Sequence, residues 1–356
     1  MGSTGSAQTQ GSEQVAGRAD VARLAGVSPA VVSYVLNDSH PVSPQTRAKV
    51  EAAIETLGYR PNALARSLAT ARSHTLGLLL PDSSNSFFAQ LASAVENAAL
   101  EAGFVVLLGN GADNAEREIG YVRTFLDRRA DGMIAVPGGV FEDGWREISR
   151  ARIPAVSLDR LPGDLDLPSV VVDNLGGGRT ATEHLIGHGR TRIACITGGR
   201  EMSSARGRAE GWELALRGAG LPVRAEHVVF GDFSAESGHA ATLALLERDP
   251  EIDGIFVGSD LQGVGVLRAL ADLGLHAGRD IGVVSFDGTV LSEYMTPRLT
   301  TVTQPYDRLA AEAVRMLVTL IEDPARDRTD MHLVLPTVLV PRDTCGCRGI
   351  SELAAA

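Results

Sequence analysis

From Thr75 onward, short apolar runs alternate with longer segments in which apolar residues recur at helical spacing. The runs are LGLLL, FVVLLG, GMIAV, PAVSL, RIACIT, GIFVG and IGVVSF. Between the first two runs, the segment from Phe87 to Ala102 places Leu91, Val95 and Ala98 on one face of a helix. A strand followed by a helix, repeated along the chain, predicts parallel sheets covered by helices on both faces. Because about 270 residues exceed one comfortable core, we expect an α/β body of two lobes.

The segment before this body predicts three short helices instead of strands. In DVARLAGVSPAVVSYVLN, from Asp20 to Asn37, Gly26 can adopt the positive φ of a turn, and Ser28 can cap the next helix ahead of Pro29. The residues expected to face inward are Val21, Leu24, Ala25, Val32, Val35 and Leu36. A third helix should lie between the cap Ser43 and the stop Gly58, with Val50, Ile54 and Leu57 inward. This pattern fits a helix-turn-helix, although an ordinary helical hairpin gives the same pattern.

The next segment, YRPNALARSL from Tyr59 to Leu68, predicts a second DNA-contacting element after the helix-turn-helix. After Pro61, Asn62 can cap a short helix. A helix of this length is marginal in water, so it should form only when a partner supports it. It would expose Leu68 beside Arg66, which suits an apolar wedge that opens a base step from the minor groove. A flexible linker with an isolated leucine is the alternative interpretation.

In these motifs, the chain resembles the LacI/GalR family of transcriptional repressors. DVARLAGVS, VSPQTRAKVEAAIETLGYRPNALARSLAT and LGLLLPDSSNSFFAQL are similar to that family's head, hinge and first core strand, in this order. The resemblance continues through VDNLGGGRTATEHLIGHGRTRIACITGG, SARGRAEGW, VGSDLQGVGVLRAL, VVSFDG and LTTVTQP, and so covers nearly all of the chain after residue 17. It implies a homodimer on a near-palindromic DNA operator, controlled by a small-molecule effector. Assembly beyond the dimer and the sign of control stay open.

The resemblance also implies which residues contact DNA. The implied residues are Ser28, Pro29, Ala30, Ser33, Tyr34, Asn37, Asn62, Arg66 and Leu68. Better-known members carry hydrogen-bonding side chains where Pro29 and Ala30 stand here. Neither residue can make a bidentate contact with a base edge, so base reading is expected to rest on Tyr34, Ser33 and DNA shape.

The domain organisation that follows has a small head and a core in which the chain changes lobes three times. We expect a disordered tail over 1–17, a helix-turn-helix domain over 18–60 and a hinge over 61–74. One core subdomain should comprise 75–173 and 304–335, the other 174–303 and 336–344, and a C-terminal tail should follow from 345 to 356. By the resemblance, this core looks like a periplasmic sugar-binding protein, with crossings near Asp173, Thr303 and Leu335.

The effector is expected between the lobes, where loops from strand ends converge. A polyol needs carboxylates and amides for its hydroxyls, an arginine for ring or edge oxygens, and an aromatic face for its C–H surface. The residues that meet these needs are Asp82, Asn85, Phe87, Phe88, Asp159, Arg160, Arg208, Phe233, Asp260 and Asp287. Structural alternatives stand beside these assignments: Asp82 and Asp260 as helix caps, Phe88 as a core residue, and Arg208 paired with Glu210 or Glu213. Family habit favours a sugar effector over a purine.

Charge and cysteine content bear on partners and compartment. The net charge is −11 and the pI is about 5.2, which at first argues against a nucleic-acid partner. From Gly17 to His74, however, the sequence has seven arginines and lysines and only four acids. An acidic body would then confine DNA contact to the basic head, although a merely solvated acidic surface is equally compatible. The start MGSTGSAQTQGSEQ is no signal peptide, no stretch has membrane-spanning length, and three cysteines cannot form a disulfide framework. We expect a cytoplasmic, nucleoid-associated protein with no membrane partner.

Enzymatic and metal chemistry is poorly supported by the sequence. GGGR at 176–179 and GGR at 198–200 match neither GxGxxG nor GxxxxGK[ST], and no GxSxG occurs. Cys345 and Cys347 form an isolated CxC, and His184 and His188 lie four residues apart beside glycines that suit a helix end. Zinc prefers four ligands and neither pair supplies them, so we expect no metal and no cofactor. A solute-binding protein would share the two-lobed body, but it would need an export signal and no helix-turn-helix.

Overall fold

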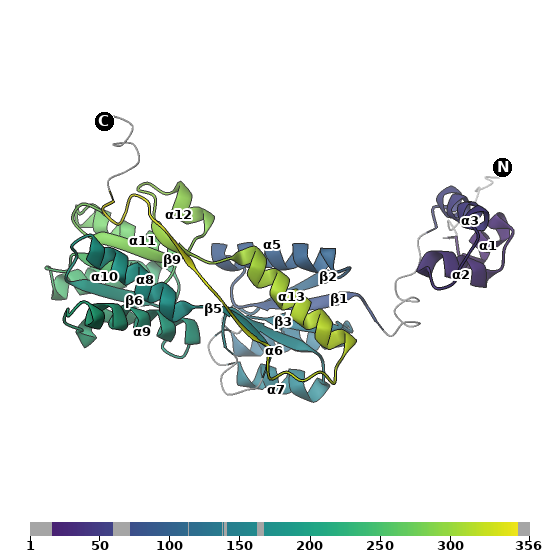
Figure 1. Ribbon diagram of the computed structural model, residues 1–356, viewed down its shortest axis with the longest axis horizontal. Helices are drawn as coiled ribbons and strands as arrows, with labels where there is room; N and C mark the ends of the chain where they lie inside the picture. Colours follow the sequence, from purple (N-terminus) through teal and green to yellow (C-terminus); the bar gives the residue numbers. More distant parts are fainter. Residues whose placement is uncertain are drawn as a thin grey trace, which may run out of the picture. The chain divides into compact units, whose positions relative to one another are not determined.

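The computed structural model describes residues 16–59, 72–112, 114–136, 138, 141–161 and 167–347. The chain divides into two compact units, 1–73 and 74–356. Among the described residues, the first unit holds three helices and the second holds two six-stranded sheets with their covering helices (Figure 1). The predicted hinge residues Asn62, Arg66 and Leu68 lie outside the described residues, as does most of the predicted N-terminal tail.

The first unit contains α1 (Arg18–Ala25), α2 (Pro29–Asn37) and α3 (Pro44–Leu57). As predicted, Gly26 ends α1 with φ 69°, and Ser28 caps α2 by accepting a hydrogen bond from the Val31 amide. Ser43 caps α3 in the same way, and Gly58 ends it with φ 57°. The helices enclose a small core of Val21, Ala22, Val32, Val35, Val50, Ala53 and Tyr59.

One inward position in this unit was predicted wrongly. Leu24 is 53% exposed, whereas Ala22 is buried. On a helix, positions 21, 22 and 25 point within about 100° of one another, and position 24 falls to one side of that arc. The core of α1 is therefore built from small side chains, and Leu24 is left on the surface.

The first lobe of the second unit is built on a sheet with strand order β11-β5-β4-β3-β1-β2, in which every pairing is parallel. Its strands are β1 (Thr75–Leu80), β2 (Val105–Asn110), β3 (Gly132–Ala135), β4 (Ala155–Leu158), β5 (Ser169–Val172) and β11 (His332–Leu335). Helices α5 (Ser86–Glu101) and α13 (Tyr306–Glu322) cover one face, and α6 (Ala115–Asp127) and α7 (Glu142–Ala151) cover the other. Alternate strand residues supply these two cores, as the pleat requires.

The second lobe has strand order β12-β10-β9-β8-β6-β7. Its strands are β6 (Ile193–Thr197), β7 (Val228–Phe230), β8 (Gly254–Val257), β9 (Gly282–Asp287), β10 (Thr300–Thr303) and β12 (Val338–Val340). Its helices are α8 (Asn174–Gly187), α9 (Ser203–Gly218), η1 (Ala225–His227), α10 (Ala235–Arg248), α11 (Asp260–Asp272) and α12 (Val290–Tyr294). Helices α8 and α9 cover one face of the sheet, and α10 and α11 cover the other. The expectation of parallel sheets holds except at the edge, where β12 pairs antiparallel with β10.

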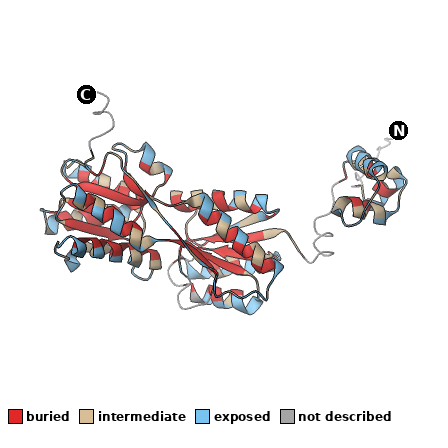
Figure 2. Ribbon diagram, viewed as in Figure 1, coloured by how far each residue is buried: buried red, intermediate tan, exposed pale blue. Residues whose placement is uncertain are grey.

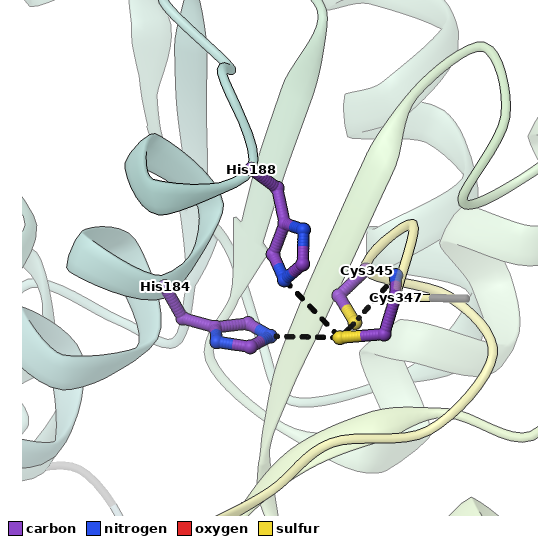
Figure 3. A group of neighbouring side chains, drawn as sticks. All are labelled: His184, His188, Cys345 and Cys347. Carbon is purple, nitrogen blue, oxygen red and sulfur yellow. Dashed lines mark hydrogen bonds between the residues drawn. The ribbon is translucent and has the colours of Figure 1, made fainter. Parts of the chain in front are cut away.

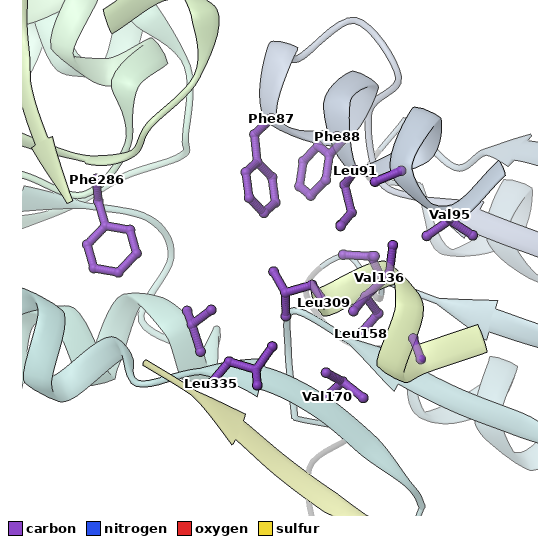
Figure 4. Close-up of a cluster of buried hydrophobic side chains, with 14 of the residues drawn as sticks. Phe87, Phe88, Leu91, Val95, Val136, Leu158, Val170, Phe286, Leu309 and Leu335 are labelled. Atoms are coloured by element: carbon purple, nitrogen blue, oxygen red, sulfur yellow. The ribbon is translucent and has the colours of Figure 1, made fainter. Parts of the chain in front are cut away.

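The chain passes between the lobes where β5 leads into α8, where β10 leads into α13, and where β11 leads into β12. One apolar cluster continues from one lobe to the other across these connections, as Figure 4 shows for Phe87, Phe88, Leu335 and Phe286. Figure 2 shows the same buried layer along both sheets, with exposed residues on the outer faces of the helices. The shared cluster fixes where the carboxyl ends of the strands in the two lobes face each other.

Cys345 and Cys347, which the prediction placed in a C-terminal tail, pack in the second lobe. Cys345 is fully buried and Cys347 is half-buried, and both pack against the core of the second lobe. The backbone amide of Val283 in β9 donates to the Thr344 carbonyl at 2.7 Å, which continues this segment alongside the sheet. In the described part of the chain, no single helix is long and apolar enough to cross a membrane. Only the bent pair Arg18–Ala25 and Pro29–Leu36, counted together, passes that test of length and composition.

Candidate functional site

A pocket lies between the two lobes, at the carboxyl ends of their strands. Its cavity volume is about 20 Å³, so the side chains of the two walls lie close together. Its lining residues are Asn85, Phe87, Phe88, Asp159, Arg160, Ser204, Arg208, Phe233, Ser259 and Asp287. A larger hollow between α5 and the start of α13 is wide open and holds neither of the buried arginines, so the interlobe pocket is the better candidate for a small ligand.

Asp159 is the pocket's most exceptional acid. It follows β4 directly, is 4% exposed and has φ 66°, a left-handed conformation that costs a residue other than glycine about 1 kcal/mol or more. Its Oδ2 lies 3.7 Å from Arg160 Nε, while its Oδ1 is buried with no hydrogen-bond partner among the described residues. Burial raises the pKa of this carboxyl, and Arg160 and Arg208 oppose the rise. An unsatisfied buried acceptor costs about 1–3 kcal/mol, which a ligand hydroxyl would recover.

Arg208, on α9, occupies the centre of the second lobe's wall and is 3% exposed. Its Nε donates to Asn174 Oδ1 at 2.8 Å, its Nη1 donates to the Gly258 carbonyl, and its guanidinium carbon lies 3.7 Å from the centre of the Phe286 ring. The Nη1 atom is also 3.5 Å from Asp287 Oδ1. The suggested pairing with Glu210 or Glu213 is wrong for Glu213, which pairs with Arg217 instead. Arg208 is therefore held rigidly and faces the pocket.

Asp287 ends β9 with φ 114°, a conformation rare for residues that carry a side chain. Burial raises the pKa of its carboxyl well above the ordinary value, although the positive charge of Arg208 opposes the rise. Its Oδ1 accepts a 2.9 Å hydrogen bond from Gln304 Nε2, and its carbonyl accepts one from the Tyr306 hydroxyl at 3.1 Å. Gln304 belongs to the connection from β10 to α13 and Tyr306 is the first residue of α13, so this acid ties the pocket to a crossing between the lobes.

Aromatic rings complete the walls. Phe88 of the first lobe lies 5.6 Å from the guanidinium carbon of Arg160, and Phe233 of the second lobe lies 5.7 Å from that of Arg208. Gly198, at the end of β6, lets the Phe233 ring lie against the strand, because a Cβ there would collide with it. The sequence GGR at 198–200 thus has a packing role. Apolar rings beside buried acids and arginines suit a ligand with both C–H faces and hydroxyl groups.

Eight of the ten predicted effector residues line the pocket, and Asp82 and Asp260 do not. The Asp82 carboxylate bonds to the Ser84 amide and hydroxyl in a local turn. Asp260 is fully buried, and its oxygens accept from Ser285, Thr301 and both donors of Thr289. It therefore organises the loops behind the pocket instead of facing a ligand. Phe88 belongs both to the pocket and to the core, so its two readings are compatible.

Two serines outside the predicted set of effector residues, Ser204 and Ser259, also line the pocket. Ser204 sits in the first turn of α9, at the start of the SARGRAEGW motif, where a small polar residue one turn before Arg208 was the available signal. Ser259 caps α11 by accepting from the Gln262 amide at 3.1 Å. A hydroxyl that serves as a helix cap gives no separate sequence signal for ligand contact.

In the helix-turn-helix unit, the predicted reading face has the expected exposure. Pro29 and Ala30 are exposed, and Ser33 and Tyr34 are half-buried on the same side of α2. The Tyr34 ring packs on the His40 ring with 4.2 Å between centres, which fixes the direction of its hydroxyl. The side chain of Asn37 lies outside the described residues.

Comparison with known protein families decides between the readings. Residues 19–62 match the model of the bacterial regulatory proteins of the lacI family, and residues 73–338 match the periplasmic binding proteins and sugar-binding domain of the LacI family. The chain belongs to the LacI family. This confirms the predicted family and fold, with a helical head on a two-lobed α/β core, and the prediction that the protein is a DNA-binding regulator of transcription and not an enzyme.

Individual relatives span nearly the whole chain. The ribose operon repressor of Escherichia coli K12 is 38% identical over 316 residues, which is 88% of this chain and 96% of that protein. A lac repressor dimer bound to operator and the anti-inducer ONPF superimposes with a TM-score of 0.80 at 31% identity, covering 93% of this chain and 99% of the other. The transcriptional regulator CelR in complex with cellobiose gives a TM-score of 0.72 at 33% identity, covering 92% and 99%. As a LacI family regulator of genes, the protein works in the cytoplasm, where the bacterial chromosome is.

Proposed function

We propose that this LacI family protein is a repressor whose dimer binds a near-palindromic operator and whose operator affinity is set by a sugar in the interlobe pocket. One observation carries the effector part: the buried Asp159, with an oxygen that has no partner among the described residues, faces a pocket that also holds Arg208 and Asp287. Such a site is built to receive hydroxyl groups.

For DNA, the proposal uses α2 of each subunit in a major groove. The reading residues are Ser28, Pro29, Ala30, Ser33, Tyr34 and Asn37, and the hinge residues Asn62, Arg66 and Leu68 would enter the central minor groove. The lac repressor structure, a dimer bound to operator, supports a dimer on two half-sites here. Binding to chromosomal operators would place the protein on the nucleoid.

A sugar fits the pocket better than a purine does. Two carboxylates and two guanidinium groups lie around a space bounded by Phe88 and Phe233, and each charged group can pair a hydroxyl. A purine base could also donate an N–H to the Asp159 oxygen, so the preference for a sugar rests on the number of hydroxyl groups that the four charged side chains can pair. The relatives named for ribose and solved with cellobiose point the same way.

Effector binding would act through the connections between the lobes. The first lobe begins at β1, which continues directly from the proposed hinge over 61–74, while Asp287 in the second lobe bonds to Gln304 and Tyr306 in the β10 to α13 connection. A ligand that binds to Asp287 or Arg208 would therefore change the position of the first lobe relative to the second. Because the hinge helix is marginal alone, a small change in that pose would decide whether it forms.

The test has two independent parts. Selection of binding sites from a random duplex library should enrich a sequence with two inverted half-sites, and failure to enrich any sequence would overturn the repressor proposal. Separately, thermal unfolding is measured with pentoses, hexoses, disaccharides and purine bases. We expect one sugar to raise the unfolding temperature and to change operator affinity in a fluorescence anisotropy titration. A response to a purine alone would overturn the sugar assignment and leave DNA binding intact. By linkage, operator DNA should change sugar affinity by the same factor.

A further inference from the structure

Outside the pocket, four metal-ligating side chains from distant parts of the second lobe come together (Figure 3). They are His184 and His188 from the end of α8, and Cys345 and Cys347 from the segment that follows β12. One ligand atom of each lies within 4.8 Å of those of the others. Cys347 Sγ is 3.6 Å from His184 Nε2, 3.1 Å from His188 Nε2 and 2.8 Å from Cys345 Sγ.

The two histidines are aligned by the helix. Residues four apart share one face of α8, and their rings lie 4.6 Å apart between centres, near perpendicular. Both Nε2 atoms point to the same sulfur atom, as Figure 3 shows. His184 is half-buried and His188 is exposed, so an ion can reach the group from solvent.

The turn that carries Cys345 and Cys347 is held in place by close packing and by hydrogen bonds. Gly346, between the two cysteines, has φ 91°, and a Cβ on it would lie 2.7 Å from the Gly278 carbonyl oxygen. Just before it, Thr344 Oγ1 donates to the Val283 carbonyl at 2.8 Å and accepts from the Thr300 amide at 2.9 Å. The Cys347 amide donates to Cys345 Sγ at 3.4 Å. The turn therefore holds both thiols against the helix end before any ion binds.

The spacing of the atoms fits a small tetrahedral ion. Zinc bonds of about 2.0–2.3 Å to nitrogen and sulfur place neighbouring ligand atoms about 3.3–3.8 Å apart. The two sulfur-to-nitrogen distances fall close to this range, and rotation of the half-buried Cys347 side chain would separate the two sulfurs by about 1 Å. A ligand set of two thiolates and two imidazoles favours zinc over magnesium, calcium or manganese.

A disulfide between the two cysteines explains less. It would use both sulfurs and leave two converging histidines with no role in the cluster. A metal ion would instead use both cysteines as thiolates together with the two imidazoles.

We propose that His184, His188, Cys345 and Cys347 form a structural zinc site that fastens the C-terminal segment to α8. With four protein ligands such a site is closed to substrate, so its role is stability and not catalysis. It would fix the end of the helix whose first residue, Asn174, holds Arg208 in the effector pocket. The site stands independently of the proposed repressor function.

The experiment uses the full chain, purified without a histidine tag and kept reduced. We expect about one zinc per chain by elemental analysis, and metal-free protein should recover its unfolding temperature on addition of Zn²⁺. Replacement by Co²⁺ should give visible bands of tetrahedral cobalt together with ultraviolet thiolate-to-cobalt charge transfer. Reduced protein that neither retains nor binds zinc would overturn the proposal. So would protein that lacks metal and carries Cys345 and Cys347 as a disulfide by mass.

Ligand variants give the second measurement. Cys347→Ser and His188→Ala should each weaken Zn²⁺ affinity by more than about 100-fold, because each removes a direct ligand. This loss exceeds the loss of affinity that follows mutation of a residue that only supports a ligand. Cys347→Ser should also lower the charge-transfer intensity of the cobalt form, a readout that a folding defect alone would not give. The matched control is His239→Ala, which should bind zinc like the unchanged protein. His239 is a half-exposed histidine of α10 that pairs with Asp272. Equal affinity in all three variants would contradict the assignment.

Discussion

Gln304 Nε2 donates a 2.9 Å hydrogen bond to Asp287 Oδ1, and this bond joins the interlobe pocket to a connection between the lobes. The same oxygen lies 3.5 Å from Arg208 Nη1, so one carboxylate links the second lobe's guanidinium to the segment that enters α13. Because Asp287 is strained at φ 114°, its position depends on these partners. A ligand that competes for the carboxylate thus competes for a bond that helps set the arrangement of the lobes.

Asp159→Asn should weaken sugar binding without changing operator affinity in the absence of sugar. The variant loses the charge and one of the two acceptors, and hydrogen bonds to charged groups contribute about 1.5–3 kcal/mol, which is about 10- to 150-fold in Kd. Isothermal titration with the sugar found by thermal shift measures the change. Asp127→Asn, on the exposed end of α6, is the matched control and should leave the Kd unchanged. Equal sugar affinity in Asp159→Asn and the unchanged protein would remove Asp159 from the site.

Arg208→Met should destabilise the core by about 3–5 kcal/mol, because it leaves buried carboxylates without their shared cation. The double variant Arg208→Met with Asp287→Asn should recover part of that loss, since one of those charges is then gone. Urea unfolding followed by tryptophan fluorescence measures both. Arg217→Met, on the same helix but 65% exposed, should cost less than about 1 kcal/mol. If Arg208→Met costs no more than Arg217→Met, the buried pair does not stabilise the lobe.

The raised pKa of Asp287 makes a signed prediction for pH. The pKa of Asp287 in the folded protein lies above the unfolded value of about 4, so the folded state holds this proton more tightly than the unfolded state. The resulting contribution to the free energy of unfolding is fully present below the unfolded pKa and is lost as the pH rises through the folded pKa. The free energy of unfolding of the unchanged protein, minus that of Asp287→Asn, should therefore fall as pH rises above about 4. Urea unfolding of both proteins over a pH series measures this difference. A difference that grows with pH would mean that Arg208 outweighs burial.

Tyr34→Phe tests the reading face of α2. The ring can stay packed on His40, so only the hydroxyl is lost, and loss of a specific base contact costs about 1–3 kcal/mol, or about 5- to 150-fold in operator affinity. Affinity for an unrelated duplex should stay the same, because phosphate contacts dominate it. Anisotropy titrations with both duplexes at one salt concentration provide the comparison. A parallel loss on both duplexes would indicate a folding or charge effect instead of base reading.

The sequence was most informative where burial follows a simple period. GIFVG and RIACIT are central strands buried on both faces, and their unbroken apolar letters predict them directly. β5, β7, β10, β11 and β12 were missed: each is only three or four residues long, and the edge strands β7, β11 and β12 have mostly half-buried or exposed residues. Leu24 was misplaced because a one-turn pattern does not fix the orientation of so short a helix.

For the candidate sites, sequence reasoning found the chemistry but not the orientation. Asp159 and Asp260 both follow strands, yet the first faces the pocket and the second turns behind it to three hydroxyl groups. That distinction depends on residues more than ten positions away. The four-residue His and Cys cluster is the extreme case, since His188 and Cys347 are 159 residues apart, so each pair was weighed alone and no metal was expected.

The glycine run GGGR is explained by helix packing, and this leads to the last prediction. A Cβ on Gly178 of α8 would collide with the backbone of Arg208 on α9, and one on Gly211 would collide with the backbone of α8. Gly178→Ala should therefore push the helices apart, cost more than about 1 kcal/mol and displace Arg208, so that sugar affinity falls as well. Gly218→Ala, at the open end of α9, meets nothing within 4 Å and should be neutral or slightly stabilising. Urea unfolding and sugar titration of both variants measure this. A fall in stability with unchanged sugar affinity would show that Arg208 keeps its place when the helices move.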